Sequence, residues 1–317
     1  MTTKEEQAEA SGAIAAVADL SATLSVAARA RDAKSLMGLI GKIDAREAVG
    51  GASDGIEQAA KNGHLACVKI LAARAPSAKA INLAMARAAA KGHADCVHFL
   101  LPMADPLFEQ SMALRHAAES GWTDCVKILA GKSNVGAMNS YALRWAARMG
   151  HAECVELLLE GSDPLAEDCY AIRYAARDGH VDCIKALLSC GHEQARNGVA
   201  LSWAAQAGHE DCVRILAPCS GPWWESLWGP LKLAAERGRT SCVSALMEAF
   251  DRDGQDQGWD AFLGKLQELA TMMRREGQIM GTRGPVESAE AMESFVEAAS
   301  LDSVIPVAGE RARRSSL

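Results

Sequence analysis

Aromatic side chains are scarce in this 317-residue chain, at 5% of all residues, although 49% of the residues are hydrophobic. Large rings contribute much of the buried area in thick globular cores, so a core of that kind is not expected. Small apolar residues favour closely stacked helices instead. The chain is long enough for a sizeable core or for one elongated repeat domain.

Long uninterrupted apolar runs are also lacking. The most apolar stretch near the start, residues 13–28, is broken by Asp19 and by several Ser and Thr residues, so no membrane-spanning helix is expected. It follows the segment Lys4-Glu5-Glu6, whereas a secretory signal begins with basic residues. We therefore expect a cytoplasmic protein with no membrane partner, and non-classical secretion into a host cell stays open as an alternative.

Several motifs that carry catalysis or metal binding are absent from the sequence. It contains no phosphate-binding glycine loop, no H-E-x-x-H and no C-x-x-C. A segment that starts at Asp251 partly resembles a calcium-binding EF-hand loop. That loop needs glycine at its sixth position and glutamate at its twelfth, where this chain has Asp256 and Phe262. We expect no enzyme activity, no cofactor and no metal.

Instead, the sequence repeats itself. Glycines recur at intervals of 29 residues, with one final interval of 30, at Gly63, Gly92, Gly121, Gly150, Gly179, Gly208 and Gly238. A cysteine follows each glycine four residues later, at Cys67, Cys96, Cys125, Cys154, Cys183, Cys212 and Cys242. An Ala-Ala pair precedes each glycine. Such self-similarity is the signature of a repeat protein.

Each repeat predicts two helices. Residues 141–160 read YALRWAARMGHAECVELLLE, with apolar positions spaced as on one helix face at Leu143, Ala146 and Ala147, and again at Val155, Leu158 and Leu159. Gly150 between the two sets permits the backbone conformation that ends a helix. Neither helix can bury its apolar face alone, so neighbouring repeats must stack to form a core.

The repeats divide the chain into three parts. We predict an N-terminal segment at 1–24 and a solenoid of about eight helix pairs at 25–250. The first pair is atypical, since Arg31 and Ser35 replace its glycine and cysteine. Residues 251–317 follow, with helices at 259–275 and 285–300 that cap the stack, and a disordered tail.

At these repeats the chain resembles the ankyrin family. The family pattern A-A-x-x-G-H is intact at 59–64, 88–93, 146–151, 175–180 and 204–209, while Trp122 and Arg239 replace the histidine elsewhere. The resemblance implies an all-α, ankyrin-like helix-turn-helix solenoid. However, the family repeat has about 33 residues, and the Thr-Pro-Leu-His start is missing here. We therefore expect short loops, a helical C-terminal cap and little or no β-hairpin.

The periodic cysteines and histidines suggest structural functions. Equivalent positions in successive repeats lie about 8–10 Å apart, too far for a disulfide, which needs Cα atoms within about 7 Å. The cysteines are therefore predicted to be small buried hydrophobes, and the histidines to bond loop backbone between repeats. A zinc site among Cys183, Cys190, His192, Cys212 and Cys219 is an alternative without the usual ligand spacing.

Partner-binding residues are expected at positions that vary between repeats. The residues five, two and one before each glycine share one face of the first helix, and the resemblance implies that this face lines a concave groove where partners bind. The predicted partner-binding residues are Arg87, Lys91, His116, Glu119, Trp145, Arg148, Met149, Tyr174, Arg177, Asp178, Trp203 and Gln206. Three aromatic residues, Trp145, Tyr174 and Trp203, form a predicted ladder. Alternatively, these rings pack between adjacent first helices.

Charge on this face differs from that of the whole chain. With the position six before each glycine included, the face has ten basic and four acidic side chains, although the net charge of the chain is −7. The arginines at 115, 144 and 173 either bind a partner or bond loop carbonyls and acids such as Asp163. We predict a monomeric protein–protein interaction module for an acidic peptide or surface, which includes inhibitor or effector functions. The alternative is a nucleotide or single-stranded nucleic-acid binder, which the net charge disfavours; an enzyme within residues 251–317 is a third hypothesis.

Overall fold

The computed structural model describes residues 47–74, 76–189, 198–220, 224–252 and 259–304, together with residue 26. Within these ranges all regular structure is helical and no strand occurs. This confirms the predicted all-α class, with short loops in place of β-hairpins. The atypical first repeat, apart from residue 26, and the predicted tail after Pro306 lie outside the described residues.

The chain forms two compact units, residues 1–167 and 168–317. The division falls inside helix α11 (Ala166–Asp178), within the predicted repeat region. The domain boundaries predicted at 24/25 and 250/251 stay predictions.

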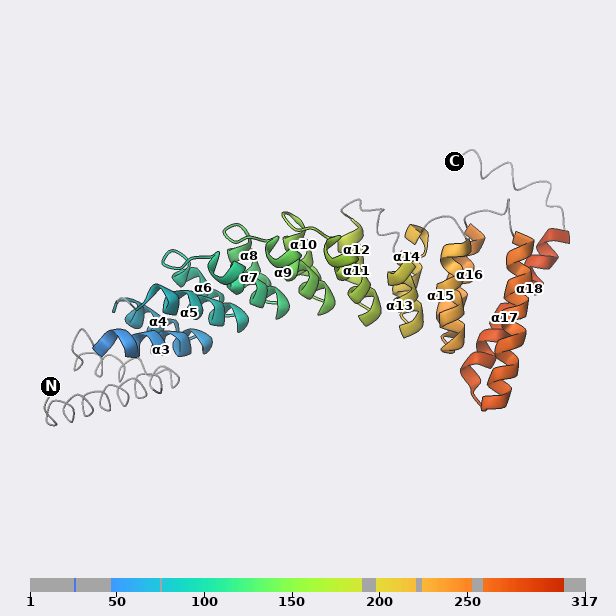
Figure 1. The fold of residues 1–317 in the computed structure, drawn as a ribbon, viewed down its shortest axis with the longest axis horizontal. Helices are drawn as coiled ribbons and strands as arrows, with labels where there is room; N and C mark the ends of the chain where they lie inside the picture. Colours follow the sequence, from blue (N-terminus) through green and yellow to red (C-terminus); the bar gives the residue numbers. More distant parts are fainter. Residues whose placement is uncertain are drawn as a thin grey trace, which may run out of the picture. The chain divides into compact units, whose positions relative to one another are not determined.

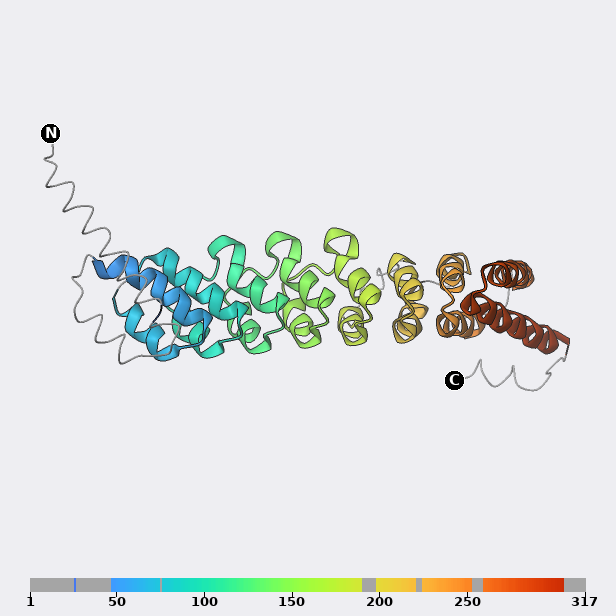
Figure 2. The same cartoon turned by 90° about the horizontal axis from the view of Figure 1, so that it is seen from below.

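Unit 1 is a stack of helix pairs in which the odd-numbered helix comes first. The pairs are α3 (Glu47–Lys61) with α4 (Leu65–Ala72), α5 (Ala78–Ala90) with α6 (Ala94–Leu100), α7 (Phe108–Glu119) with α8 (Thr123–Ala130), and α9 (Ala137–Arg148) with α10 (Ala152–Leu159). First helices contact first helices, and second helices contact second helices, so this unit has two layers (Figures 1 and 2).

Unit 2 continues the pattern and ends in a longer hairpin (Figure 1). After α11 its elements are α12 (Val181–Leu188), α13 (Gly198–Ala207), α14 (Glu210–Leu216), the short 3-10 helix η1 (Pro218–Ser220), α15 (Trp224–Glu236), α16 (Thr240–Arg252), α17 (Trp259–Met280) and α18 (Arg283–Val304). Helices α17 and α18 pack on α15, and α18 also packs on α16. The start of α18 lies close to the turn between α15 and α16, where a Cβ on Gly238 would be 2.6 Å from the Cα of Gly284. This hairpin is the predicted helical cap.

The core contains the recurring alanine and cysteine positions of the repeats, as predicted. Each Ala-Ala pair is completely buried at 59–60, 88–89, 117–118, 146–147, 175–176, 204–205 and 234–235. The seven periodic cysteines are at most 1% exposed, and all seven are free thiols. Their predicted function as small buried hydrophobes is confirmed, and no disulfide forms among the nine cysteines that the structure describes.

Successive repeats are joined at the turn between their two helices. Gly63 has a φ of +71°, and a Cβ there would lie 2.5 Å from the imidazole of His93 in the next repeat. The same ring bonds backwards, with Nε2 of His93 3.0 Å from the carbonyl oxygen of Lys61. His209 makes the equivalent contact with the carbonyl of Arg177, at 2.9 Å. The predicted histidine-to-backbone bonds between repeats are therefore confirmed at these two positions.

Unexpected left-handed turns stand at the start of three first helices. In each, three consecutive residues have positive φ, at 109–111, 138–140 and 167–169, and none of them is glycine. They lie at the repeat position where the missing β-hairpin would join the first helix. The left-handed region costs an ordinary L-residue roughly 1–2 kcal/mol, so other contacts must hold these turns in place.

A buried side chain in each of three repeats fixes the loop that follows. The hydroxyls of Ser111 and Ser140, in residues no more than 1% exposed, accept hydrogen bonds from the backbone N–H groups of Asn134 and Asp163, at 2.9 and 2.7 Å. Asn82 Oδ1 does the same for the next loop of its repeat, at 2.8 Å from the N–H of Asp105. These bonds satisfy loop backbone and tie each first helix to the connection 23 residues later.

Replacing Met138 by glycine is expected to stabilise unit 1 by about 0.5–1 kcal/mol. Met138 has a φ of +52° and its side chain is 47% exposed, so glycine relieves backbone strain and removes little packing. The strain of about 1–2 kcal/mol exceeds the usual glycine penalty of about 0.5–1 kcal/mol. Urea unfolding measures the change.

Met149 provides the matched control for this variant. It is 42% exposed but has a φ of −87°, so Met149→Gly relieves no strain and should destabilise the unit. The strained-turn interpretation is wrong if Met138→Gly is no more stable than the wild type.

Candidate partner-binding face

The first-helix face is defined here by the residues five, two and one before each periodic glycine. None of the described residues at these positions is buried. In unit 1 the face contains the predicted residues Arg87, Lys91, His116, Glu119, Trp145, Arg148 and Met149. In unit 2 it contains Tyr174, Arg177, Asp178, Trp203 and Gln206. Continuation of the aromatic ladder from Trp145 to Tyr174 would cross between the units and stays a prediction.

In unit 1 a cluster of rings and guanidinium groups lies on and beside the face, formed by α9 and one arginine of α7. Tyr141 and Trp145 are one helical turn apart, and their rings stack with centroids 5.5 Å apart. The guanidinium of Arg148 lies 4.5 Å from the centroid of the Trp145 ring. Arg115 and Arg144 approach the Tyr141 ring to 5.3 and 6.0 Å. These cation–π contacts hold a basic, aromatic surface in a defined geometry.

In unit 2 a similar cluster spans α11 and α13. Tyr170 stacks on Tyr174 at 4.0 Å, and Tyr174 meets the edge of Trp203 at 5.4 Å. The guanidinium of Arg177 lies 4.3 Å over Tyr174, and that of Arg173 lies 5.5 Å over Trp203. The alternative that the rings pack between adjacent first helices is therefore observed for Tyr174 and Trp203, which remain half-buried.

Part of the basic charge on the face is compensated by neighbouring acids. Arg87 pairs with Glu57 of the preceding repeat at 3.1 Å. Arg177 donates two hydrogen bonds to Asp178, at 2.7 and 2.9 Å. These bonds raise the pKa of the Arg177 guanidinium, and burial opposes them. Because these pairs are exposed, each contributes little stability, but they reduce the charge that a partner meets.

The arginine column at 115, 144 and 173 has a structural function. Arg115 donates to the carbonyls of Glu109 and Gln110 at 2.9 and 3.1 Å. Arg144 makes the same pair of bonds to the left-handed turn at 138–140, at 2.9 and 2.8 Å. Arg173 instead pairs with the Asp168 carboxylate at 3.0 Å. The bonding to loop carbonyls that the sequence left open is thus observed, and the acid is Asp168 rather than Asp163.

Two aromatic residues of the clusters, Tyr141 and Tyr170, were missed by the sequence analysis. They stand one helical turn before Trp145 and Tyr174, outside the three columns that define the face. The i, i+4 spacing of two aromatic residues in both repeats is the signal that would have predicted them.

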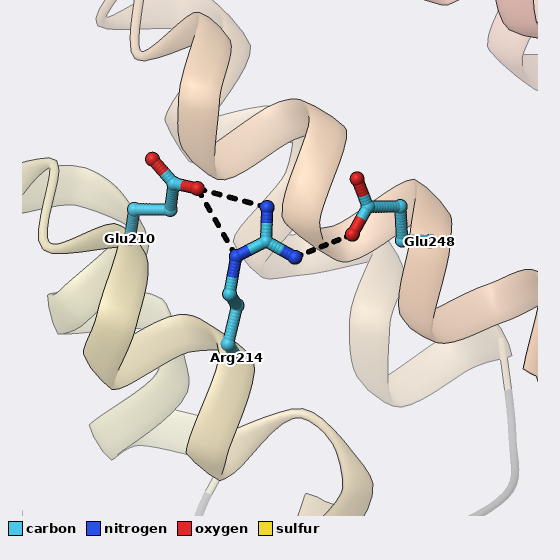
Figure 3. Close-up of polar contacts among 3 residues, drawn as sticks. All are labelled: Glu210, Arg214 and Glu248. Carbon is cyan, nitrogen blue, oxygen red and sulfur yellow. Dashed lines mark hydrogen bonds and ion pairs between the residues drawn. The ribbon is translucent and has the colours of Figure 1, made fainter.

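Other polar features lie away from this face. On the second helices of unit 2, Arg214 of α14 binds Glu210 at 2.8 Å and also reaches Glu248 of α16 (Figure 3). The hydrogen bonds that Arg214 donates to Glu248 and Glu210 raise the pKa of its guanidinium. A solvent-exposed network of this kind links adjacent repeats and suggests no chemistry.

A polar pocket of about 580 Å³ lies in unit 1 near the turn at 138–140. Its lining residues are Gly136, Asn139, Ser140, Gly161, Ser162, Asp163, Leu165, Ala166 and Glu167. None of the predicted partner-binding residues lines it.

Across the described ranges, no group of three or more His, Cys, Asp or Glu side chains could hold a metal ion. No described helix is both long and apolar enough to cross a bilayer.

Stacked helix–turn–helix repeats with a helical cap define the class of this protein. A family model described as "Ankyrin repeats (3 copies)" matches residues 85–168 and residues 165–224. Residues 85–224 therefore match the ankyrin repeat family, as the A-A-x-x-G-H pattern predicted. Ankyrin repeats are generally protein–protein interaction modules and typically non-catalytic.

Among solved structures, the crystal structure of the human ASB11 ankyrin repeat domain is similar to the chain. The two share 23% sequence identity over 53% of this chain and 83% of that one, with a TM-score of 0.45. No curated protein sequence matches the chain.

Proposed function

We propose that the first-helix faces of these ankyrin repeats bind an acidic segment of a partner protein. The observation that carries the proposal is the stacking of guanidinium groups on half-buried rings, at Trp145 with Arg148 and at Tyr174 with Arg177. Tryptophan, tyrosine and arginine contribute most to binding energy at protein interfaces. Their mutual contacts reduce the side-chain entropy that binding would otherwise cost.

Charge supports an acidic partner. The charge count again includes the position six before each glycine. On the first-helix face, unit 1 then has six basic and two acidic side chains, and unit 2 has four basic and two acidic side chains. Complementary charge increases the association rate and disfavours partners of like charge. An inhibitor or effector function would follow where the acidic segment belongs to the target's own functional surface. The free thiols fit a reducing compartment such as the cytoplasm.

The same residue types suit single-stranded nucleic acid, which is the second hypothesis. Bases bind such proteins by stacking on aromatic rings. Here guanidinium groups already lie 4.5 and 4.3 Å over Trp145 and Tyr174, so a base would have to displace them. That geometry favours a protein partner over a nucleic acid.

Selection from a phage-displayed random-peptide library tests the proposal. We expect the wild-type protein to enrich acidic peptides. Arg148→Glu should weaken their binding about tenfold or more in fluorescence anisotropy, because it reverses charge at the centre of the unit 1 cluster. Lys127→Glu is the control, since Lys127 is exposed on the second helix α8 and its reversal should leave affinity unchanged.

Two results would contradict the proposal. One is the absence of acidic peptides among those enriched, and the other is equal loss of binding in both charge-reversal variants. Binding of a single-stranded oligonucleotide with a steep dependence on salt would favour the nucleic-acid hypothesis instead.

A further inference from the structure

Trp122 occupies the position of the inter-repeat histidine. Its indole N–H donates to the carbonyl of Ala90 at 3.1 Å, and a Cβ on Gly92 would lie 2.4 Å from its ring. His93 makes the corresponding contacts one repeat earlier, with the carbonyl of Lys61 at 3.0 Å and the α-carbon side of Gly63. The two side chains therefore perform the same structural task.

Tryptophan is larger than this task requires. Trp122 remains 43% exposed although its N–H is bonded and one part of its ring covers Gly92. An imidazole fulfils the task in neighbouring repeats, so stacking alone does not explain the additional apolar surface of the indole. An exposed tryptophan indicates a binding surface, because tryptophans that a partner buries are frequent anchors of protein interfaces.

The indole adjoins the first-helix face of unit 1. Its hydrogen-bond acceptor, Ala90, and the neighbouring residue Lys91 both belong to that face, and Lys91 is exposed. The indole is therefore bonded to the residue that directly precedes the cationic residue Lys91 at the end of α5 (Ala78–Ala90). An acidic residue and an apolar side chain close together on one partner segment would complement this pair.

We propose that Trp122 is the apolar anchor of the interface and selects acidic partner segments that carry an aromatic or branched aliphatic side chain. This inference rests on the proposed function and adds to it a specificity that charge alone does not provide. The apolar side chain of the partner packs on the exposed part of the indole, while carboxylates of the same segment face Lys91 and the other basic side chains of unit 1.

Trp122→His is the decisive variant, because the chain itself shows that histidine fits this position. We expect its unfolding midpoint to stay close to that of the wild type. In panning of the random-peptide library, the wild type should enrich acidic peptides with a recurrent aromatic or branched aliphatic residue. Trp122→His should still enrich acidic peptides but without that residue. The peptides selected by the wild type should bind the variant about tenfold more weakly.

The outcomes separate the two proposals. Acidic peptides without a recurrent apolar residue, or the same apolar preference in Trp122→His, overturn the anchor and leave the acidic-partner proposal intact. Failure to enrich acidic peptides at all overturns both. The anchor is supported when the apolar preference disappears in Trp122→His while sensitivity to Arg148→Glu remains.

Discussion

At pH 10 the free energy of unfolding is expected to be about 4–5 kcal/mol lower than at pH 8, because of four buried thiols. Burial raises the pKa values of Cys96, Cys125, Cys212 and Cys242 from 9.0 to about 11. Nearby carboxylates act in the same direction, such as that of Asp124 on Cys125.

The sign follows from proton binding in the two states. Between about pH 9 and 11 the unfolded chain has lost these thiol protons while the folded chain keeps them. The unfolded state then binds fewer protons, so stability falls as pH rises. Below pH 9 both states are protonated and the full stability is present. At pH 10 each thiol accounts for about 1 kcal/mol of the loss.

Urea unfolding at pH 8 and pH 10 under reducing conditions measures this loss. Cys125→Ala should lose about 1 kcal/mol less than the wild type between the two pH values, whatever its stability at pH 8. Val126→Ala is the control, because Val126 is also completely buried in α8 but does not titrate. If Cys125→Ala and Val126→Ala show the same pH dependence, the buried thiols are not the cause.

Much of the fold was predictable because the repeat encodes it locally. A glycine between two apolar stripes permits a turn that other residues rarely adopt, and the observed φ values of +71° at Gly63 and +75° at Gly121 agree. The Ala-Ala pairs were predictable as core because only small side chains allow first helices to stack so closely. Repetition makes each of these signals independent evidence for the same structure.

The left-handed turns were not predictable from the residues that form them. Glu109, Gln110 and Met138 have no preference for positive φ. In the turns at 109–111 and 138–140 the conformation is held from elsewhere, by an arginine six residues after the first residue of the turn and by the buried hydroxyl of the third residue. Local sequence patterns do not carry such nonlocal constraints, which is also why the function of the arginine column remained open at the sequence level.

The candidate site was predictable in position but not in detail. Core positions are constrained by stacking, so the repeat positions at which residues vary were expected to be on the surface. These positions identified the first-helix face. The pairing of Arg177 with Asp178 and the stacking of Tyr170 on Tyr174 depend on side-chain orientation, which helical spacing alone does not determine. Trp122 was identified only as a deviation from the repeat pattern, and its exposure became apparent in the structure.

Replacing Gly121 by valine is expected to destabilise unit 1 by about 2–5 kcal/mol. Gly121 has a φ of +75°, and an added Cβ would lie 2.4 Å from Nδ1 of the His151 ring. Left-handed backbone costs an L-residue about 1–2 kcal/mol, and a β-branched side chain fits that region worst. Displacing the ring of the next repeat adds an overpacking cost of about 1–3 kcal/mol.

Gly131→Ala is the matched control for this variant. Gly131 ends α8 with a φ of −73°, and an added Cβ there meets no atom within 4 Å, so alanine should be neutral or stabilise by up to about 1 kcal/mol. Because repeats contact only their neighbours, Gly121→Val should weaken one interface and also lower the urea dependence of unfolding. Equal stability of the two variants would show that the turn tolerates a side chain and that ring stacking on glycine does not hold the repeats together.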